Sequence, residues 1–406
     1  MCARLPGSLL LGVLGALVSM TACGGGGDGD ASQPPPATPP AAAPPPVSSP
    51  PPAPPPPPPT VAFTAVDTLA GQYGVRGGAD GKGSEATFNY PVGLAVTGAA
   101  GASNGEALLY IAALNEAIRY EQVGYADNPV GTAIGNGNSG SVDGTATTAR
   151  VRAPQGIAIG YDSDAYEAYA FWTEDDSCVV RKLTRYPLNG NRQAVTIAGK
   201  AYECGTGDGA ASSARFNRPG GILANRRTGE VFVVDSGNYT LRRIYGPTVT
   251  TVAGASGQSG TTDGAGASAR FRYPRFIAMD QKESLYVTDG YTVRLITPAG
   301  VVTTLAGKGD ESGYKDGPAA DARFGRLQGI ALDEYGNVYV ADPDNHCIRR
   351  ITVDGTVSTL TGVSTVVGAA DGNLAAATFD TPMGLAYYNK QLFVADSGGQ
   401  TIRRIR

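Results

Sequence analysis

The stretch Gly313–Thr352, "GYKDGPAADARFGRLQGIALDEYGNVYVADPDNHCIRRIT", contains the pattern that decides the fold. It begins with an Asp-Gly turn at Asp316 and an Ala-Arg-Phe triplet, followed by runs of alternating apolar and polar residues that are typical of β-strands. It also holds the only histidine of the chain, His346. Two interpretations compete: a catalytic site built on Asp316, Asp342 and His346, or a repeated structural unit.

The same pattern recurs six times along the chain. Its Asp-Gly turns begin at positions 53 to 65 residues apart: Asp80, Asp143, Asp208, Asp263, Asp316 and Asp371. Each turn is followed by an Ala-x-Phe-like triplet and by short apolar or alternating runs bounded by Gly, Asp, Asn or Pro. Repeats of this size with four strands each are typical of a β-propeller. We therefore predict an all-β fold, a six-bladed β-propeller.

The two ends of the repeat region predict how the ring closes. The segment "AVDTLAG" (Ala65–Gly71) matches the fourth strand of the unit but stands before the first full repeat, whereas the chain ends at Arg406 on a third strand. An N-terminal strand that completes the C-terminal blade would remove an open sheet edge. We expect this closure, within a propeller domain that spans residues 61–406.

The repeat "VTTLAGKGDESGYKDGPAADARF" with "GIALDEYGNVYVADPDNHCIRRIT" resembles the NHL-repeat family, and the resemblance covers residues 65–406. The triplet that names the family appears most fully as Asn345-His346-Cys347, and in other units it becomes Asn238-Tyr239-Thr240 or Gly399-Gln400-Thr401. The resemblance implies a six-bladed propeller of NHL type. It leaves the function open, because such propellers include RNA binders, protein-interaction platforms, extracellular sensor domains and metal-dependent lyases.

The recurrence favours a structural role for the acidic residues of the quoted stretch. Asp316 has five equivalents, and an Asp at such a turn can cap the short segment that follows it. Asp342 corresponds to Asp235, Asp289 and Asp396, with Glu174 in the second unit. Each of these acids faces a strand that carries a repeated arginine, so we expect a cross-strand ion pair in each blade.

A single histidine limits the chemistry that the chain can perform. Serine and cysteine nucleophiles usually need a histidine base, and catalytic zinc typically takes two or three histidines. The histidines that surround the metal of NHL-like lyases therefore have no counterparts here beyond His346. Asp175, Asp176 and Asp344 could offer oxygen ligands to Ca²⁺, but no twelve-residue calcium loop is present. We expect no cofactor, with Ca²⁺ as the alternative.

The N-terminal residues 1–22 resemble a bacterial lipoprotein signal peptide. Arg4 supplies a positive charge, Leu9 to Val18 is an apolar run, and small residues precede Cys23. In this interpretation Cys23 becomes the lipidated N-terminus; the alternative is a plain secretory signal that is cut near Ala22. Gly24 after the cysteine suggests the outer membrane, by resemblance to the sorting rule of Gram-negative lipoproteins.

In this interpretation residues 23–60 contain the lipidated Cys23 followed by a disordered Gly- and Pro-rich stalk. Seventeen of the 29 prolines lie between Pro34 and Pro59, and the segment has almost nothing apolar to bury. Such a segment favours polyproline II, and at about 3.1 Å per residue the stretch from Pro34 to Pro59 would reach roughly 80 Å. We expect it to hold the propeller away from a membrane.

Export implies an oxidising compartment for the remaining cysteines. Cys178 opens the third strand of the second blade, and Cys204 lies in the crossover that follows this blade. Loops between second and third strands lie on the same face as the crossovers, so we predict a Cys178–Cys204 disulfide and an unpaired Cys347.

Two faces of the propeller compete as the binding surface. The face that carries the crossovers is where propellers usually bind ligands, and its candidate residues are Tyr90, Arg152, Arg218, Tyr273, Arg275, Arg326 and Gln328 near the channel mouth, with Asp175, Tyr291, Asp344 and His346 further out. The opposite face carries insertions in the first two blades, and insertions in repeats often mark a binding rim. Its candidate anchors are Tyr161, Tyr166, Tyr169 and Tyr186. We favour the crossover face.

Charge narrows the choice of ligand. The net charge is −4 and no long basic run is present, which argues against a nucleic-acid partner. We predict a monomeric, exported, lipid-anchored propeller that binds a protein or glycan of the cell envelope without catalysis. The alternative is a carboxylate- and calcium-dependent lyase or hydrolase with its site at the propeller channel.

Overall fold

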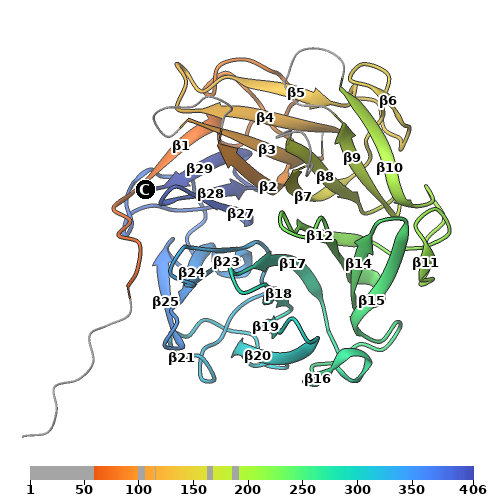
Figure 1. Cartoon of the computed structure of the whole chain (residues 1–406). Coiled ribbons are helices and arrows are strands. Elements are labelled where there is room, and N and C mark those ends of the chain that lie inside the picture. The colour runs from red at the N-terminus through yellow and green to blue at the C-terminus, as the bar shows by residue number, and fades with distance from the viewer. Residues whose placement is uncertain (1–58, 99–105, 115, 162–167, 185–191) are drawn as a thin grey trace, which may run out of the picture. The chain divides into compact units, whose positions relative to one another are not determined.

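A computed structural model describes residues 59–98, 106–114, 116–161, 168–184 and 192–406. In this part of the chain six antiparallel sheets stand around a central axis like the blades of a propeller (Figure 1). The predicted all-β fold with six blades is therefore confirmed. No helix of the described residues is long and apolar enough to cross a membrane.

Each blade has four main strands, which follow one another from the channel outward. Blade 1 contains β2 (Pro91–Gly98), β3 (Ala107–Ala113), β4 (Ala117–Val123) and β5 (Val130–Ile134). Blade 2 contains β7 (Pro154–Tyr161), β8 (Ala168–Glu174), β9 (Val179–Thr184) and β10 (Gln193–Gly199). Blade 3 contains β12 (Pro219–Ala224), β13 (Val231–Asp235), β14 (Thr240–Tyr245) and β15 (Thr248–Gly254).

The last three blades follow the same order. Blade 4 contains β17 (Pro274–Met279), β18 (Leu285–Asp289), β19 (Thr292–Ile296) and β20 (Val301–Gly307). Blade 5 contains β22 (Ile330–Leu332), β23 (Val338–Asp342), β24 (Cys347–Ile351) and β25 (Thr356–Thr361). Blade 6 contains β27 (Pro382–Tyr388), β28 (Gln391–Asp396), β29 (Thr401–Ile405) and β1 (Ala65–Gly71). Three 3₁₀ turns occur among the described residues: η1 (Ser236–Asn238), η2 (Gly266–Ser268) and η3 (Pro343–Asn345).

The N-terminal strand closes the ring as the sequence predicted. β1 pairs antiparallel with β29, with Val66 opposite Ile405 and Gly71 opposite Thr401. An ion pair of 2.6 Å between Arg404 and Asp67 joins the same two strands. The first and last segments of the propeller therefore share one sheet.

The structure adds a short outer strand that the sequence did not predict. The residues that follow each Asp-Gly aspartate from the second repeat onward form a two-residue strand on the outer edge of the blade: β6 (Gly144–Thr145), β11 (Gly209–Ala210), β16 (Gly264–Ala265), β21 (Gly317–Pro318) and β26 (Gly372–Asn373). In blade 1 the equivalent Gly81 makes a single bridge to Val130. Gly317 adopts φ 127°, a region that favours glycine, which explains the glycine after the aspartate.

The Asp-Gly aspartates hold the outer strands rather than the segments that follow them. In blade 5 the Asp316 carboxylate accepts hydrogen bonds from the backbone N–H and the hydroxyl of Thr359 on β25. It also pairs at 2.5 Å with Arg349 on β24. The expected structural role of Asp316 is thus confirmed, but the expected cap is wrong. Its partners lie on β24 and β25, and not in the segment that follows the turn.

The repeated arginine is buried at the centre of every blade. The guanidinium of Arg349 also pairs with Asp342 at 3.2 Å, and both side chains are fully buried. The ring of Phe324, the last residue of the Ala-Arg-Phe triplet, lies 4.9 Å from the same guanidinium. Equivalent cross-strand pairs occur in four other blades: Arg181–Glu174, Arg242–Asp235, Arg294–Asp289 and Arg403–Asp396. The predicted cross-strand ion pairs are therefore present in five blades, whereas blade 1 has Ala113 at the position of the acid.

The triplet Asn345-His346-Cys347 has a structural role at the turn between the second and third strands of blade 5. In η3 the Asn345 side chain donates to Asp342 and to the Gly313 carbonyl, and His346 follows with φ 51° in the left-handed region. Asn238 makes the same two kinds of bond in blade 3. His346 accepts a hydrogen bond at Nδ1 from the Thr381 backbone N–H at 3.4 Å. This histidine therefore fixes a turn between two blades.

Apolar clusters fill the spaces between neighbouring blades. The alanine and the aromatic residue of each triplet are completely buried there, as Ala322 and Phe324 are between blades 4 and 5. Blade 2 has Val151 in place of the phenylalanine, and the indole of Trp172 from β8 lies 5.4 Å from Arg181 instead. In blade 2 the aromatic contact to the buried arginine therefore comes from Trp172 on β8 and not from the triplet.

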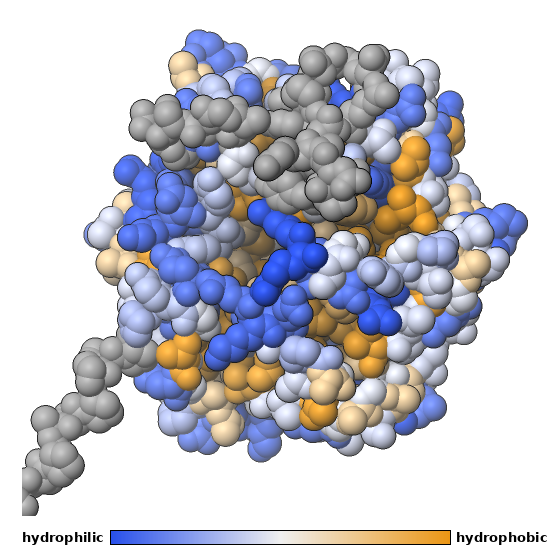
Figure 2. Space-filling view, in the orientation of Figure 1, coloured by the Kyte–Doolittle hydropathy of each residue, from blue (hydrophilic) through white to orange (hydrophobic). Residues whose placement is uncertain are grey.

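The innermost strands enclose a channel with aliphatic walls. These walls include Leu94, Ile157, Ile222, Ile277 and Leu385. Figure 2 shows the centre of one face hollowed, with hydrophobic residues visible in the recess and hydrophilic residues around it. We call the end where the innermost strands begin the crossover mouth, and the end where they turn into the second strands the hairpin mouth.

Candidate functional site

The crossover mouth contains a cavity of about 440 Å³ over blades 4, 5 and 6. It is formed where β17, β22 and β27 begin and where the loops between second and third strands approach them. We call it the arginine pocket, lined by Arg272, Tyr273, Arg275, Gly290, Tyr291, Arg326, Leu327, Gln328, Pro343, Asp344, Thr381 and Met383. A smaller adjoining cavity of about 190 Å³ reaches Arg218 in blade 3 and shares Tyr273 and Arg275.

Three guanidiniums from consecutive blades influence one another at this mouth. Arg218 directly precedes β12, and Arg275 is the second residue of β17. Arg326 directly precedes Leu327 in blade 5. Burial lowers the pKa of Arg275, Asp175 raises it, and the positive charges of Arg218 and Arg326 lower it further. These side chains therefore form a positive cluster, in which Arg275 is partly buried and Arg218 and Arg326 are exposed.

Only one of the three arginines has a carboxylate partner among the described residues. Arg218 pairs with Asp175 at 3.2 Å, and this hydrogen bond raises its pKa. Within that part of the chain, no acidic side chain lies within ion-pair distance of Arg275 or Arg326. A partly buried guanidinium without a carboxylate partner, such as that of Arg275, favours an anionic ligand, because its planar fork offers several donors.

Tyrosine rings flank the cationic groups. The Arg272 guanidinium lies 5.8 Å from the ring of Tyr273 and 5.9 Å from that of Tyr291, and it is held by Asp310 and the Gly309 carbonyl. Tyr273 is 52% exposed. A ring fixed beside an arginine presents an apolar face at small entropic cost, so the pocket can contact both charged and apolar parts of a ligand.

The backbone at this mouth is held in an uncommon conformation. Residues that precede the first proline of an innermost strand adopt positive φ in four blades: Tyr90 at 46°, Ala153 at 42°, Arg218 at 51° and Thr381 at 58°. Such values are rare outside glycine and cost energy that the surrounding structure must offset. The packing of the blades therefore fixes the backbone of these four residues, and with it the positions of their side chains.

The structure brings together six of the eleven residues that the sequence singled out. Tyr273, Arg275, Tyr291, Arg326, Gln328 and Asp344 line the arginine pocket. Asp344 also accepts a hydrogen bond of 2.9 Å from the Arg326 backbone N–H. Arg218 and Asp175 stand beside the pocket as an ion pair.

The other three residues lie elsewhere on the crossover face. The Tyr90 hydroxyl accepts a hydrogen bond from Arg76, and its backbone N–H donates to Gln400. Arg152 pairs with Asp176 at 3.1 Å, and His346 makes its turn contact to Thr381. None of the three lines the pocket.

Sequence reasoning missed Arg272, Thr381 and Met383 in this pocket. Thr381 and Met383 are the blade 6 equivalents of Arg326 and Gln328, so comparison of all six units at these positions could have found them. Arg272 stands directly after the triplet of blade 4, where the repeat offers no distinctive signal. A whole second cavity at the hairpin mouth was also missed, since its residues lie in ordinary hairpin loops.

Two of the three acidic side chains considered for Ca²⁺ are engaged in ion pairs, and the third, Asp344, accepts the backbone N–H of Arg326. Asp175 and Asp176 contact Arg218 and Arg152, respectively. Among the described residues, no group of three or more His, Cys, Asp or Glu side chains is placed to hold a metal ion.

Two of the described cysteines are joined to each other. A disulfide links Cys178 and Cys204, with their Cα atoms 5.3 Å apart, and Cys347 is buried and free. Of the tyrosines proposed on the rival face, Tyr169 is described, and its ring lies 3.5 Å from the Lys182 ammonium. Cys23, Tyr166, Tyr186 and the side chain of Tyr161 lie outside the described residues.

Comparisons with known proteins agree with this fold. No family model matches the chain. It is 27% identical over 305 residues to the chloroplastic protein SUPPRESSOR OF QUENCHING 1 of Arabidopsis thaliana, covering 70% of this chain and 27% of that protein. It is 31% identical over 173 residues to NHL repeat-containing protein 2 of Bos taurus, covering 39% of this chain and 24% of that protein. The chain is a six-bladed β-propeller, and part of its sequence is similar to an NHL repeat-containing protein.

Solved structures extend the comparison across the propeller. A Bacteroides thetaiotaomicron protein of unknown function superposes with a TM-score of 0.60 at 22% identity, over 84% of this chain and 75% of that one. A protein from the same organism described as an auxiliary nutrient binding protein gives a TM-score of 0.61 at 17% identity, over 84% and 76%. At these identities the likeness shows the fold alone. The chain spans about a quarter of the length of the two curated relatives.

Proposed function

We propose that this NHL-type propeller is exported, anchored to a membrane through Cys23, and binds an anionic glycan of the cell envelope without catalysis. The observation that carries the proposal is the arginine pocket, in which Arg275 and Arg326 have no described counter-ion. Sulfate or carboxylate groups of a glycan would supply the missing negative charge, and the tyrosine rings would contact its sugar rings.

The shape of the site favours a glycan over a protein ligand. Protein partners usually bury about 800 Å² on each side of a broad interface, whereas compact ligands occupy concave pockets of roughly 300–1,000 Å³. The cavity of about 440 Å³ belongs to the second class. Two solved structures of similar fold are described as auxiliary nutrient binding proteins, which is compatible with a binding role.

A calorimetric titration with the uronic-acid trisaccharide trimannuronate tests this function. We expect binding that weakens strongly between 50 and 500 mM NaCl, because salt screens the attraction between the guanidiniums and the carboxylates. Substituting Arg275→Gln or Arg326→Gln should each raise Kd about tenfold or more, since a charge-assisted hydrogen bond contributes about 1.5–3 kcal/mol.

The matched control is Lys82→Gln, which removes one positive charge from an exposed ion pair with Asp127 outside the pocket. It should leave Kd unchanged. Equal affinity of the wild type and both arginine variants would contradict the proposal. Release of a shortened or unsaturated sugar during the titration would favour the alternative of a lyase or hydrolase instead.

A further inference from the structure

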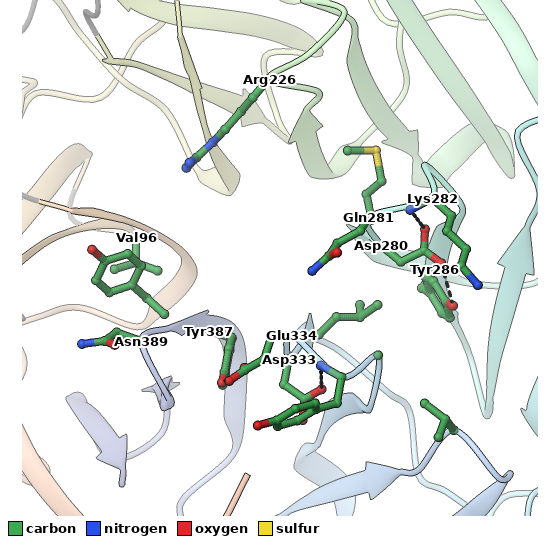
Figure 3. A pocket seen from close by; sticks show the side chains of 16 residues that line it. Val96, Arg226, Asp280, Gln281, Lys282, Tyr286, Asp333, Glu334, Tyr387 and Asn389 are labelled. Carbon is green, nitrogen blue, oxygen red and sulfur yellow. Dashed lines mark hydrogen bonds between the residues drawn. The ribbon is translucent and has the colours of Figure 1, made fainter. Parts of the chain in front are cut away.

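A second cavity lies at the hairpin mouth, opposite the arginine pocket. Its volume is about 750 Å³ (Figure 3). Hairpin loops of blades 3 to 6 surround it, and residues at the ends of the innermost strands form its floor, among them Val96, Met279 and Leu332. We call it the hairpin pocket. No residue of the arginine pocket contributes to it.

Two turns of the rim are fixed by aspartates. Asp280 accepts hydrogen bonds from the backbone N–H groups of Lys282 and Ser284 and from the Tyr286 hydroxyl. Asp333 does the same in the next blade for the backbone of Tyr335 and Asn337. Because these carboxylates hold the loops, the rim is preorganised for a ligand.

Polar side chains without described partners stand on this rim. Figure 3 shows Gln281, Lys282 and Asn389 placed around the opening, with Arg226 reaching toward it from blade 3. No hydrogen bond or ion pair of the side chains of Gln281, Lys282 or Asn389 occurs among the described residues. Their amide and ammonium groups can donate to a ligand, and the two amide oxygens can also accept.

Four tyrosines add aromatic surface: Tyr286, Tyr335, Tyr387 and Tyr388. Tyr387 is held in place, because its hydroxyl donates to Glu334 and its ring stacks on Tyr339 with a centroid separation of 6.4 Å. Tyr335 is 42% exposed and its side chain has no hydrogen bond among the described residues. Fixed and exposed rings of this kind can pack against the apolar C–H face of a sugar.

The charge of this pocket differs from that of the arginine pocket. Its lining has two cationic residues, Arg226 and Lys282, and three acidic ones, Asp280, Asp333 and Glu334. The lining of the arginine pocket has three arginines and one aspartate. A nearly balanced lining selects no strongly charged ligand, and it suits a molecule that offers hydroxyl donors and acceptors together with an apolar face.

From this combination we propose that the hairpin pocket binds a neutral saccharide, with Tyr335 as the stacking platform and Gln281 and Asn389 as hydrogen-bonding groups. The proposal is independent of the function assigned to the arginine pocket, since the two pockets share no residue.

Calorimetric titration with the neutral trisaccharides maltotriose, cellotriose and chitotriose tests the inference. We expect at least one of them to bind, with a Kd that changes less than twofold between 50 and 500 mM NaCl. Tyr335→Ala should raise this Kd at least tenfold and Gln281→Ala severalfold. The Tyr335→Ala variant keeps the hydrogen bond from the backbone N–H of residue 335 to Asp333, so the unfolding temperature of the variant should match that of the wild type.

Two controls separate the pockets. Tyr245→Ala removes another tyrosine, 58% exposed and outside the pocket, and Arg326→Gln alters the opposite mouth; neither should change the affinity for the neutral sugar. Absence of binding with all three trisaccharides would overturn the inference. So would binding that survives both Tyr335→Ala and Gln281→Ala, or that is lost in Arg326→Gln.

Discussion

At the scale of single residues, the buried arginines explain why the unit repeats its acidic positions. Arg349 has both a buried partner, Asp342, and a half-exposed one, Asp316, and its guanidinium also donates to backbone carbonyls. A buried guanidinium is tolerated only when most of its donors are used. The six Asp-Gly turns therefore recur because each satisfies a buried cation.

Replacing the buried acid should strongly destabilise the fold. In Asp342→Ala, Arg349 loses one of its two carboxylate partners, and the Gly325 N–H and the Asn345 amide lose an acceptor. We expect the free energy of unfolding to fall by about 3–5 kcal/mol, measured by urea denaturation. The exposed Asp321→Ala is the control and should change it by less than about 0.5 kcal/mol. Equal stability of both variants would contradict this role of Asp342.

Glu121 breaks the pattern of the unit at the junction of blades 1 and 6. It stands two residues after the repeated arginine, where the other blades have a buried leucine or isoleucine: Leu183, Ile244, Ile296, Ile351 and Ile405. Glu121 is fully buried, and neither carboxyl oxygen has a hydrogen-bond partner among the described residues. Burial raises its pKa to about 8, although Arg404 lowers it, while Asp67 raises it further.

The raised pKa of Glu121 predicts a pH dependence of stability. Between the ordinary pKa of 4.5 and about 8, the folded chain retains a proton that the unfolded chain loses, so the free energy of unfolding falls as the pH rises through this window. Glu121→Leu should remove this loss and gain the most stability, on the order of several kcal/mol, at pH 9. Urea denaturation at pH 5, 7 and 9 measures the effect. The exposed Glu85→Gln should keep the wild-type slope; an unchanged slope in Glu121→Leu would contradict the assignment.

At the scale of elements, β1 holds the ring together from two sides. Leu69 and Ala70 belong to the apolar cluster between blades 6 and 1, and Val66 belongs to that between blades 5 and 6. Phe63, just before the strand, packs edge-on against Tyr339 at 5.7 Å. Without β1, both clusters would be open and β29 would expose a strand edge.

Removing the closing strand should therefore abolish the closed ring. A chain that begins at Gly74 should form oligomers in size-exclusion chromatography and lose its cooperative thermal transition, because β29 becomes an edge that can pair with another copy. A chain that begins at Thr60 keeps the strand and should remain monomeric. A monomeric chain from Gly74 with the transition temperature of the longer chain would show that β1 is dispensable.

At the scale of the whole molecule, the channel has two mouths of different chemistry. The crossover mouth is rich in arginine, and the hairpin mouth combines tyrosines, amides and a balanced charge. Aliphatic walls separate them. One fold thus presents two separate cavities of different chemistry, and we propose a different ligand for each.

The proposed anchor can be tested on the whole protein. Cys23→Ser should prevent incorporation of a fatty-acid label and move the protein from the membrane fraction to the soluble fraction, because the thiol is the proposed site of lipid attachment. Cys347→Ser is the control, since that cysteine is buried in β24 and should not affect location. Unchanged membrane association of Cys23→Ser would contradict the lipoprotein interpretation.

The sequence by itself determined the number of blades, the closure by Ala65–Gly71 and the cross-strand acid–arginine pairs, because all three follow from a local repeat and its strand alternation. Only the tertiary structure decided which side chains meet. Arg218, Arg275 and Arg326 come from separate repeats, and they converge because the innermost strands all begin around one axis. The partners of Asp316 and the hairpin pocket could not be predicted from the sequence either. Both depend on contacts between strands and loops that lie far apart along the chain, and no spacing in the repeat indicates these contacts.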